Sequence, residues 1–86
     1  MDGYSVVTTD DKRFGRLVGT QGDCYIIERG SLLRKTRYPL PKRYVSIMRE
    51  EECARVQVSK ETLSGGPRVT RNGAVDEEAI AAYYGD

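Results

Sequence analysis

Residues 30–48 constrain the fold more than any other stretch, because two prolines interrupt a segment that otherwise favours extended structure. Pro39 and Pro41 have no backbone N–H to donate, so they cannot occupy a central strand of a sheet. They predict a bend or the edge of a sheet. The segment ends in an alternating run that places Val45 and Ile47 on one face of an expected strand.

Further strands are expected on both sides of this segment. Residues 54–58 repeat the alternation after a glutamate-rich turn, which predicts an antiparallel hairpin. Three earlier runs, 4–9, 14–19 and 24–29, resemble strands and are separated by turn residues. The glycines within 14–19 predict a bulge, a bend or a close backbone approach. We therefore expect an all-β, mainly antiparallel sheet of about five to six strands, closed into a small β-barrel.

The composition changes towards the C-terminus. Residues 64–74 contain glycine and proline and have little to bury, so we expect a flexible linker there. The linker would join a β-domain at 1–63 to a short C-terminal helix and tail at 75–86. Asp76 is the expected N-cap of that helix, and Gly85 is its expected end.

The composition also excludes several classes of function. The chain has 86 residues, 38% hydrophobic and 31% charged, which indicates one folded domain with a small core. It has no histidine, and Cys24 and Cys53 have no further ligand nearby, so we expect reduced thiols and no metal site. The adjacent glutamates at 50–52 would point in different directions and stay solvated. We expect no catalytic residues, no cofactor and no enzyme activity.

The N-terminus has no basic region followed by an apolar run, and no apolar run in the chain approaches the length of a membrane span. We therefore expect a cytoplasmic protein that does not contact a membrane.

The strongest charge imbalance lies between positions 29 and 49, which hold seven basic residues and no acid. The predicted basic surface consists of Arg29, Arg34, Lys35, Arg37, Lys42, Arg43 and Arg49. Tyr38 and Tyr44 lie between these residues. The segment therefore has the composition of a single-strand RNA or DNA binder, with cations on phosphates and tyrosines stacked on bases. The alternative is a solvated basic edge that discourages association between sheets.

The C-terminal helix is the second candidate for partner binding. The residues expected to take part are Asp76, Glu77, Glu78, Ile80, Tyr83 and Tyr84. The three acids complement the basic segment, so the helix could dock there in the same or a neighbouring protomer. The apolar and aromatic members share one helix face through their i, i+3, i+4 spacing. Docking on a neighbour would give a homodimer; the alternative is a frayed tail.

Three segments together resemble the PRC-barrel family. Residues 14–18 (FGRLV) have the glycine-plus-hydrophobic pattern of the family's second strand, and residues 56–63 (VQVSKETL) are similar to its closing strand and turn. Between them, residues 38–40 with Val45 resemble a Y-x-P-L…V segment, although proline directly follows the tyrosine here. The resemblance covers residues 4–63.

The resemblance implies a small, mainly antiparallel β-barrel that serves as an assembly or adaptor module and has no shared catalytic residues. We therefore expect a non-enzymatic protein–protein interaction or self-assembly module that binds a protein partner or a second copy of itself. RNA or DNA binding through the basic segment is the alternative.

Overall fold

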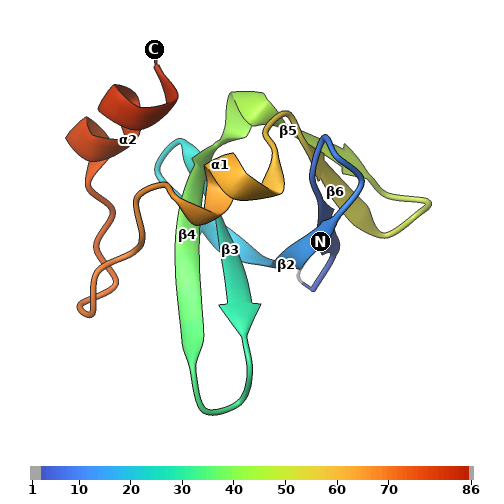
Figure 1. The fold of residues 1–86 in the computed structure, drawn as a ribbon, viewed down its shortest axis with the longest axis horizontal. Coiled ribbons are helices and arrows are strands. Elements are labelled where there is room, and N and C mark those ends of the chain that lie inside the picture. Colours follow the sequence, from blue (N-terminus) through green and yellow to red (C-terminus); the bar gives the residue numbers. More distant parts are fainter. Residues whose placement is uncertain (1–2, 86) are drawn as a thin grey trace.

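Six strands form one mixed sheet in the computed structural model, which describes residues 3–85 (Figure 1). Within these residues the strands are β1 (Ser5–Val7), β2 (Arg13–Gln21), β3 (Cys24–Gly30), β4 (Lys35–Pro41), β5 (Val45–Met48) and β6 (Cys53–Val56). Their order across the sheet is β4-β3-β2-β1-β6-β5. Neighbouring strands are antiparallel except β1 and β6, which run parallel. The expected strand number and the mainly antiparallel pairing are confirmed.

The predicted closure into a barrel is wrong, because β4 and β5 are the open edges of the sheet. The prolines give a physical reason at β4. The carbonyl oxygen of Arg37 accepts a hydrogen bond from the Val69 N–H at 2.8 Å, so Arg37 presents its backbone away from β3. Pro39 and Pro41 follow at two-residue spacing and present their backbones to the same side, where neither has an N–H to donate. A closing strand would lack both hydrogen bonds, and the edge position predicted from the prolines is confirmed.

The glycines of β2 allow a close backbone approach and a bulge, as the sequence predicts. A Cβ at Gly15 would overlap the carbonyl oxygen of Glu28 on β3, so only glycine lets the two backbones lie this close. The register of β2 against β3 slips between Leu17 and Gly19, which marks a bulge. Bulges bend a strand and increase its twist. The close approach and the bulge expected from these glycines are both present.

In the described part of the chain, three short helical segments accompany the sheet: η1 (Lys42–Tyr44), α1 (Lys60–Ser64) and α2 (Glu77–Tyr84). The Ser59 side chain caps α1 by accepting a hydrogen bond from the Thr62 N–H at 3.1 Å. The Asp76 side chain caps α2 by accepting from the Ala79 N–H at 3.1 Å, and the helix ends at Gly85 with φ of 77°. The expected C-terminal helix is confirmed, whereas η1 forms where an extended strand was expected to begin.

The core lies on one face of the sheet beneath α1. Its buried residues are Val6, Phe14, Leu17, Ile27, Tyr38, Leu40, Ala54, Val56 and Leu63. Leu63 is the contribution of α1 and is fully buried. Val45 and Ile47, on the edge strand β5, are only partly buried and pack against this cluster from the side.

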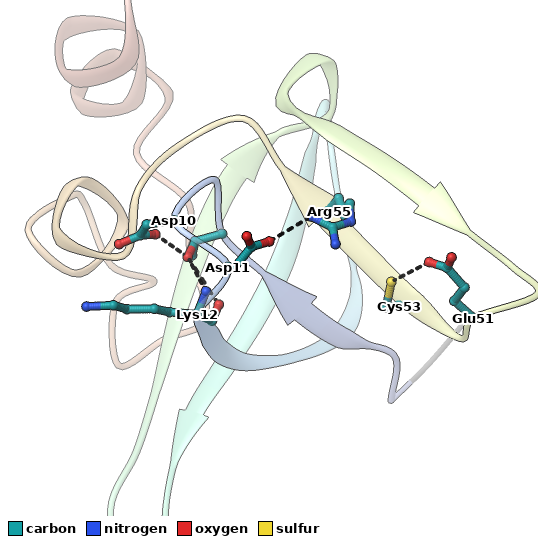
Figure 2. A network of polar contacts seen from close by, with 7 residues as sticks. Asp10, Asp11, Lys12, Glu51, Cys53 and Arg55 are labelled. Carbon is teal, nitrogen blue, oxygen red and sulfur yellow. Dashed lines mark hydrogen bonds and ion pairs between the residues drawn. The ribbon is translucent and has the colours of Figure 1, made fainter.

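A polar network joins the β1–β2 turn to α1 and β6; Figure 2 shows the contact with β6, between Asp11 and Arg55. Buried Thr8 donates its hydroxyl hydrogen to Asp10, and the same carboxylate oxygen accepts the Lys60 N–H at 3.2 Å. The hydrogen bond from Thr8 is the largest cause that lowers the pKa of Asp10. Asp11 forms an ion pair with Arg55 at 3.3 Å. The network holds the first turn against the start of α1.

Candidate functional site

The hairpin of β3 and β4 projects beyond the rest of the sheet. The last pair that β2 shares with β3 in this direction joins Arg16 to Glu28, whereas β3 and β4 stay paired as far as Gly30 and Lys35. The hairpin therefore extends past the other strands, as Figure 1 shows. Beyond the Arg16–Glu28 pair, β3 and β4 are paired only with each other.

Two leucines at the hairpin tip are almost fully exposed. Leu32 is 91% exposed and Leu33 is 95% exposed. The turn is closed by the Ser31 N–H, which donates to the carbonyl oxygen of Arg34 at 2.9 Å. Gly30 begins it with φ of 126°, a conformation that other residues rarely adopt. The turn thus exposes two large apolar side chains to solvent. Covering them with another apolar surface would lower the free energy.

The seven residues of the predicted basic surface do not form one patch. They form a hairpin group, a group at the other end of β4, and a single residue in the turn after β5. The hairpin group is Arg29, Arg34, Lys35 and Arg37; the group at the other end of β4 is Lys42 and Arg43; and the single residue is Arg49. A strand rises about 3.3 Å per residue, so the first two groups are about 20 Å apart along β4. The basic segment is continuous only in the sequence.

Glu28 is the acid at the centre of the hairpin group. Its carboxylate lies 3.6 Å from the Lys35 ammonium and 3.2 Å from Nε of Arg37, and its side chain is only 15% exposed. The strand register places Arg16 on the other side of it. Several cations therefore surround one largely buried, paired acid, and the surface keeps an excess of positive charge.

Two further arginines, which the sequence places in the expected linker, join the hairpin group. Residues 68–73 follow the outer edge of β4 through the hydrogen bond from Val69 to Arg37. Arg68 and Arg71 consequently line a groove of about 750 Å³ together with Lys35 and Arg37. Val69 and Thr70 are adjacent β-branched residues, which favour extended structure. This is the signal in the sequence that agrees with a segment lying along a sheet edge.

The tyrosines of the C-terminal helix pack on their own chain. The ring centroid of Tyr84 lies 5.8 Å from that of Tyr44 and 4.9 Å from that of Tyr83. Tyr44 donates its hydroxyl to the main-chain oxygen of Tyr84 at 2.7 Å, and Tyr83 donates to that of Thr62, also at 2.7 Å. Gly66 lies against both helix tyrosines, because a Cβ there would fall 2.7 Å from the Tyr84 hydroxyl. Aromatic contacts and hydrogen bonds therefore hold α2 in place.

The acidic start of α2 lies near Arg43, at the end of β4 that is away from the hairpin group. Asp76 caps its own helix, and Glu77 and Glu78 are exposed in its first turn. Glu77 lines a small pocket of about 180 Å³ with Arg43 and buried Ile80. Arg43 also donates to the main-chain oxygen of Gly85, at the end of α2 where carbonyl groups carry partial negative charge.

The tyrosines expected to stack on bases are both engaged within the fold. Tyr38 is only 4% exposed, and its ring makes an edge contact with Phe14 at 5.0 Å. Tyr44 is in contact with Tyr84 and carries Arg43 over its ring at 4.9 Å. Neither ring has an open face beside the hairpin group.

The cysteines are unpaired thiols, Cys24 buried and Cys53 partly buried. Burial is the largest cause that raises the pKa of both thiols. In the part of the chain that the structure describes, no three Cys, Asp or Glu residues are grouped so that they could hold a metal ion.

Comparison with known proteins gives no family: no family model matches the chain, and no curated protein matches it. None of the described helices is long and apolar enough to cross a membrane.

Proposed function

We propose that this chain is a non-enzymatic protein-binding module whose principal contact is the tip of the β3–β4 hairpin. The exposed pair Leu32 and Leu33 carries the proposal. Covering one leucine side chain stabilises a complex by roughly 1.5–3 kcal/mol. A phosphate backbone offers no comparable apolar surface, so the leucines favour a protein partner.

The basic residues beside the hairpin tip indicate the kind of surface that such a partner would have. Arg34 and Lys35 follow the leucines directly, and Arg29 lies on the neighbouring strand. A partner with an apolar pocket and an acidic rim would match this surface. The charges would steer the encounter, whereas the leucines would slow dissociation.

A partner of different sequence is favoured over a second copy of this chain. A symmetric contact between two hairpin tips would bring the Arg34 and Lys35 side chains of both copies together, and like charges oppose such a contact. Docking of α2 on a neighbour is not needed to bury Ile80, because Ile80 is already buried in its own chain. The homodimer predicted from the sequence thus has less support than a heterologous complex.

RNA or DNA binding by the segment 29–49 also has less support than protein binding. Its cations are divided among three regions, and Tyr38 and Tyr44 are engaged within the fold.

We also infer a relationship to the PRC-barrel family. The three resembling segments lie on β2, on β4 with the start of β5, and from the end of β6 into α1, so each falls on an element of the sheet domain. The open sheet is a departure from a closed barrel. An adaptor role, as that family implies, agrees with a projecting apolar tip.

The test compares the wild-type chain with two hairpin variants. Leu32→Ser/Leu33→Ser removes the apolar surface, and Leu32→Met/Leu33→Met retains it as a matched control. Both positions are exposed, so melting temperatures should differ little, within roughly 0.5 kcal/mol of stability. Proteins from the native source should bind immobilised wild-type and Met chains saturably and should be lost from the Ser variant.

Adding a partner found in this way should shift the amide NMR signals of residues 30–36. The proposal is wrong if the Ser variant retains every protein that the wild type binds, or if the shifted signals lie on β5 and β6. A dimer of the wild type that the Ser substitutions convert to a monomer would make a second copy the partner.

A further inference from the structure

Three adjoining depressions form a continuous track across β2, β3 and β4. Their volumes are about 350, 750 and 230 Å³. The first two share Glu28 and Lys35 in their linings, and the last two share Arg37, Val69 and Gly73. Because neighbouring depressions share walls, one extended ligand can occupy all three. The turn at 68–73 forms the outer wall.

Positive charge dominates this track, which we call the cationic track. The cations that line it include Arg16, Arg29, Lys35, Arg37, Arg68 and Arg71. Glu28 is the one acid among the described residues that line it, and its carboxylate is already paired. The whole chain has a net charge of only +1, so the fold has concentrated positive charge here. Local charge of this kind attracts an anion more strongly than the net charge suggests.

Two of the arginines are held in place by aromatic rings of the core. The guanidinium carbon of Arg68 lies 5.5 Å from the ring centroid of Tyr38, and that of Arg29 lies 4.6 Å from that of Phe14. Both rings are buried beneath their arginines, and they contact each other at 5.0 Å. An arginine over an aromatic ring loses side-chain freedom while its N–H groups remain available at the edges of the guanidinium plane. These arginines are thus partly ordered before a ligand arrives.

We propose that the cationic track binds the phosphodiester backbone of a nucleic acid. Arginine N–H groups match phosphate oxygens in geometry and charge. The length of the track fits a chain of phosphates better than a single anion. The largest depression has no aromatic residue in its lining, so no stacking on bases is available there, and binding should depend little on base sequence. This site does not use the hairpin leucines and is independent of the proposed protein contact.

The test measures the affinity of the full chain for a fluorescent 20-nucleotide oligouridylate between 50 and 200 mM NaCl. If four phosphates bind, the affinity should fall about 50-fold over this range, since each phosphate contributes about 0.7 to the logarithmic salt slope. Arg68→Ala/Arg71→Ala should weaken binding about 10-fold at 50 mM and reduce the slope by about 1.4. A duplex of equal length, run in parallel, reports whether the backbone is bound single- or double-stranded.

The matched control is Arg49→Ala/Arg55→Ala, which removes two arginines from the β5–β6 hairpin at the other side of the sheet and changes the net charge equally. This control should keep the wild-type affinity and slope, and so should Leu32→Ser/Leu33→Ser. Equal weakening of binding in the two double-arginine variants would show nonspecific electrostatic attraction rather than binding at the cationic track. Loss of binding in the leucine variant would place the contact at the hairpin tip, and wild-type binding to phosphatidylserine vesicles without oligonucleotide binding would identify a membrane ligand. Each of these three results overturns the proposal, as does the absence of binding at 50 mM NaCl.

Discussion

Tyr44 donates its phenolic hydrogen to the main-chain oxygen of Tyr84, 2.7 Å away, and so joins the end of η1 to the last turn of α2. The hydroxyl of Tyr84 itself is buried and has no hydrogen-bond partner among the described residues. Two tyrosines whose rings lie 5.8 Å apart thus have opposite consequences for stability. The Tyr44 hydroxyl holds α2 in place. The Tyr84 hydroxyl loses its hydrogen bonds to water on folding, and no described residue replaces them.

Removing each hydroxyl in turn should separate these effects. Tyr44→Phe breaks a hydrogen bond and leaves a carbonyl unsatisfied, which should cost about 1 kcal/mol of stability. Tyr84→Phe removes an unpaired buried hydroxyl and should stabilise the fold by up to about 1 kcal/mol. Urea denaturation of the two variants measures both values, and each serves as the control for the other. Equal destabilisation by the two changes would contradict the contacts described.

Alkaline pH should weaken the fold through Tyr84. Burial, the largest cause, and then neighbouring Tyr83, Cys24 and Tyr44 raise the pKa of its hydroxyl well above the ordinary tyrosine value of 10.0. A raised pKa means that the folded state holds its proton longer than the unfolded state. This contribution to stability is therefore complete below pH 10 and declines as the pH rises beyond it. The decline should be smaller in Tyr84→Phe, and a spectrophotometric titration at 295 nm should show one tyrosine that ionises last in the wild type only.

Gly66 is the position where the helix tyrosines press most closely on the preceding segment. A Cβ there would lie 2.7 Å from the Tyr84 hydroxyl and 3.0 Å from the Tyr83 ring. Gly66→Ala should therefore displace α2 and cost about 1 kcal/mol, because the aromatic side chains must shift. Gly19→Ala is the matched control, since a Cβ at Gly19 meets nothing within 4 Å. Tyrosine fluorescence with thermal denaturation would measure the difference, and similar melting temperatures would argue against a docked tail.

Gly30 sets the direction of the hairpin turn. Its φ of 126° is unfavourable for any other residue, and a Cβ would overlap the carbonyl oxygen of Arg34. Gly30→Ala should cost about 1–3 kcal/mol and disorder the tip. The measurement is hydrogen exchange at residues 31–35, which should become faster, with Gly19→Ala again as the control. Unchanged exchange would mean that the turn adopts another geometry.

Acid should weaken the contact between the β1–β2 turn and α1. The pKa of Asp10 is lowered from 3.8, first of all by the hydrogen bond from Thr8. A lowered pKa means that the stabilisation is complete above pH 3.8 and is lost as the pH falls through the folded-state value. Asp10→Asn should remove this part of the pH dependence. Thermal unfolding of both proteins between pH 2 and 6 tests this expectation.

Local sequence patterns predicted most of the strands, because alternating, β-branched or short apolar runs are separated by turn residues. The hairpin of β5 and β6 and the edge position of Pro39 and Pro41 follow from period-two patterning and from missing donors. The cap Asp76 follows from a side chain that accepts from the next turn of its own helix. These features depend on neighbours within a few residues.

The candidate sites could be predicted less well, because they depend on partners that are distant in sequence. Seven cations between positions 29 and 49 look continuous, but the length of β4 separates Lys42 and Arg43 from the hairpin group. Arg68 belongs with the cationic track only because Val69 pairs with Arg37, more than thirty positions away. Leu32 and Leu33 are apolar residues that local patterning would sooner bury than expose. Their exposure follows from the projection of the hairpin beyond β2.

The sequence by itself determined which segments form most of the strands and the C-terminal helix, and which strand must lie at an edge, because propensity, capping and the missing proline N–H act locally. Only the tertiary structure decided that the sheet stays open and that the tail lies along β4. It also decided that Tyr38 fills the core and that positive charge from three separate segments converges on one track. Those outcomes depend on which distant surfaces can be covered together, and burial of apolar area acts between residues without regard to their order in the chain.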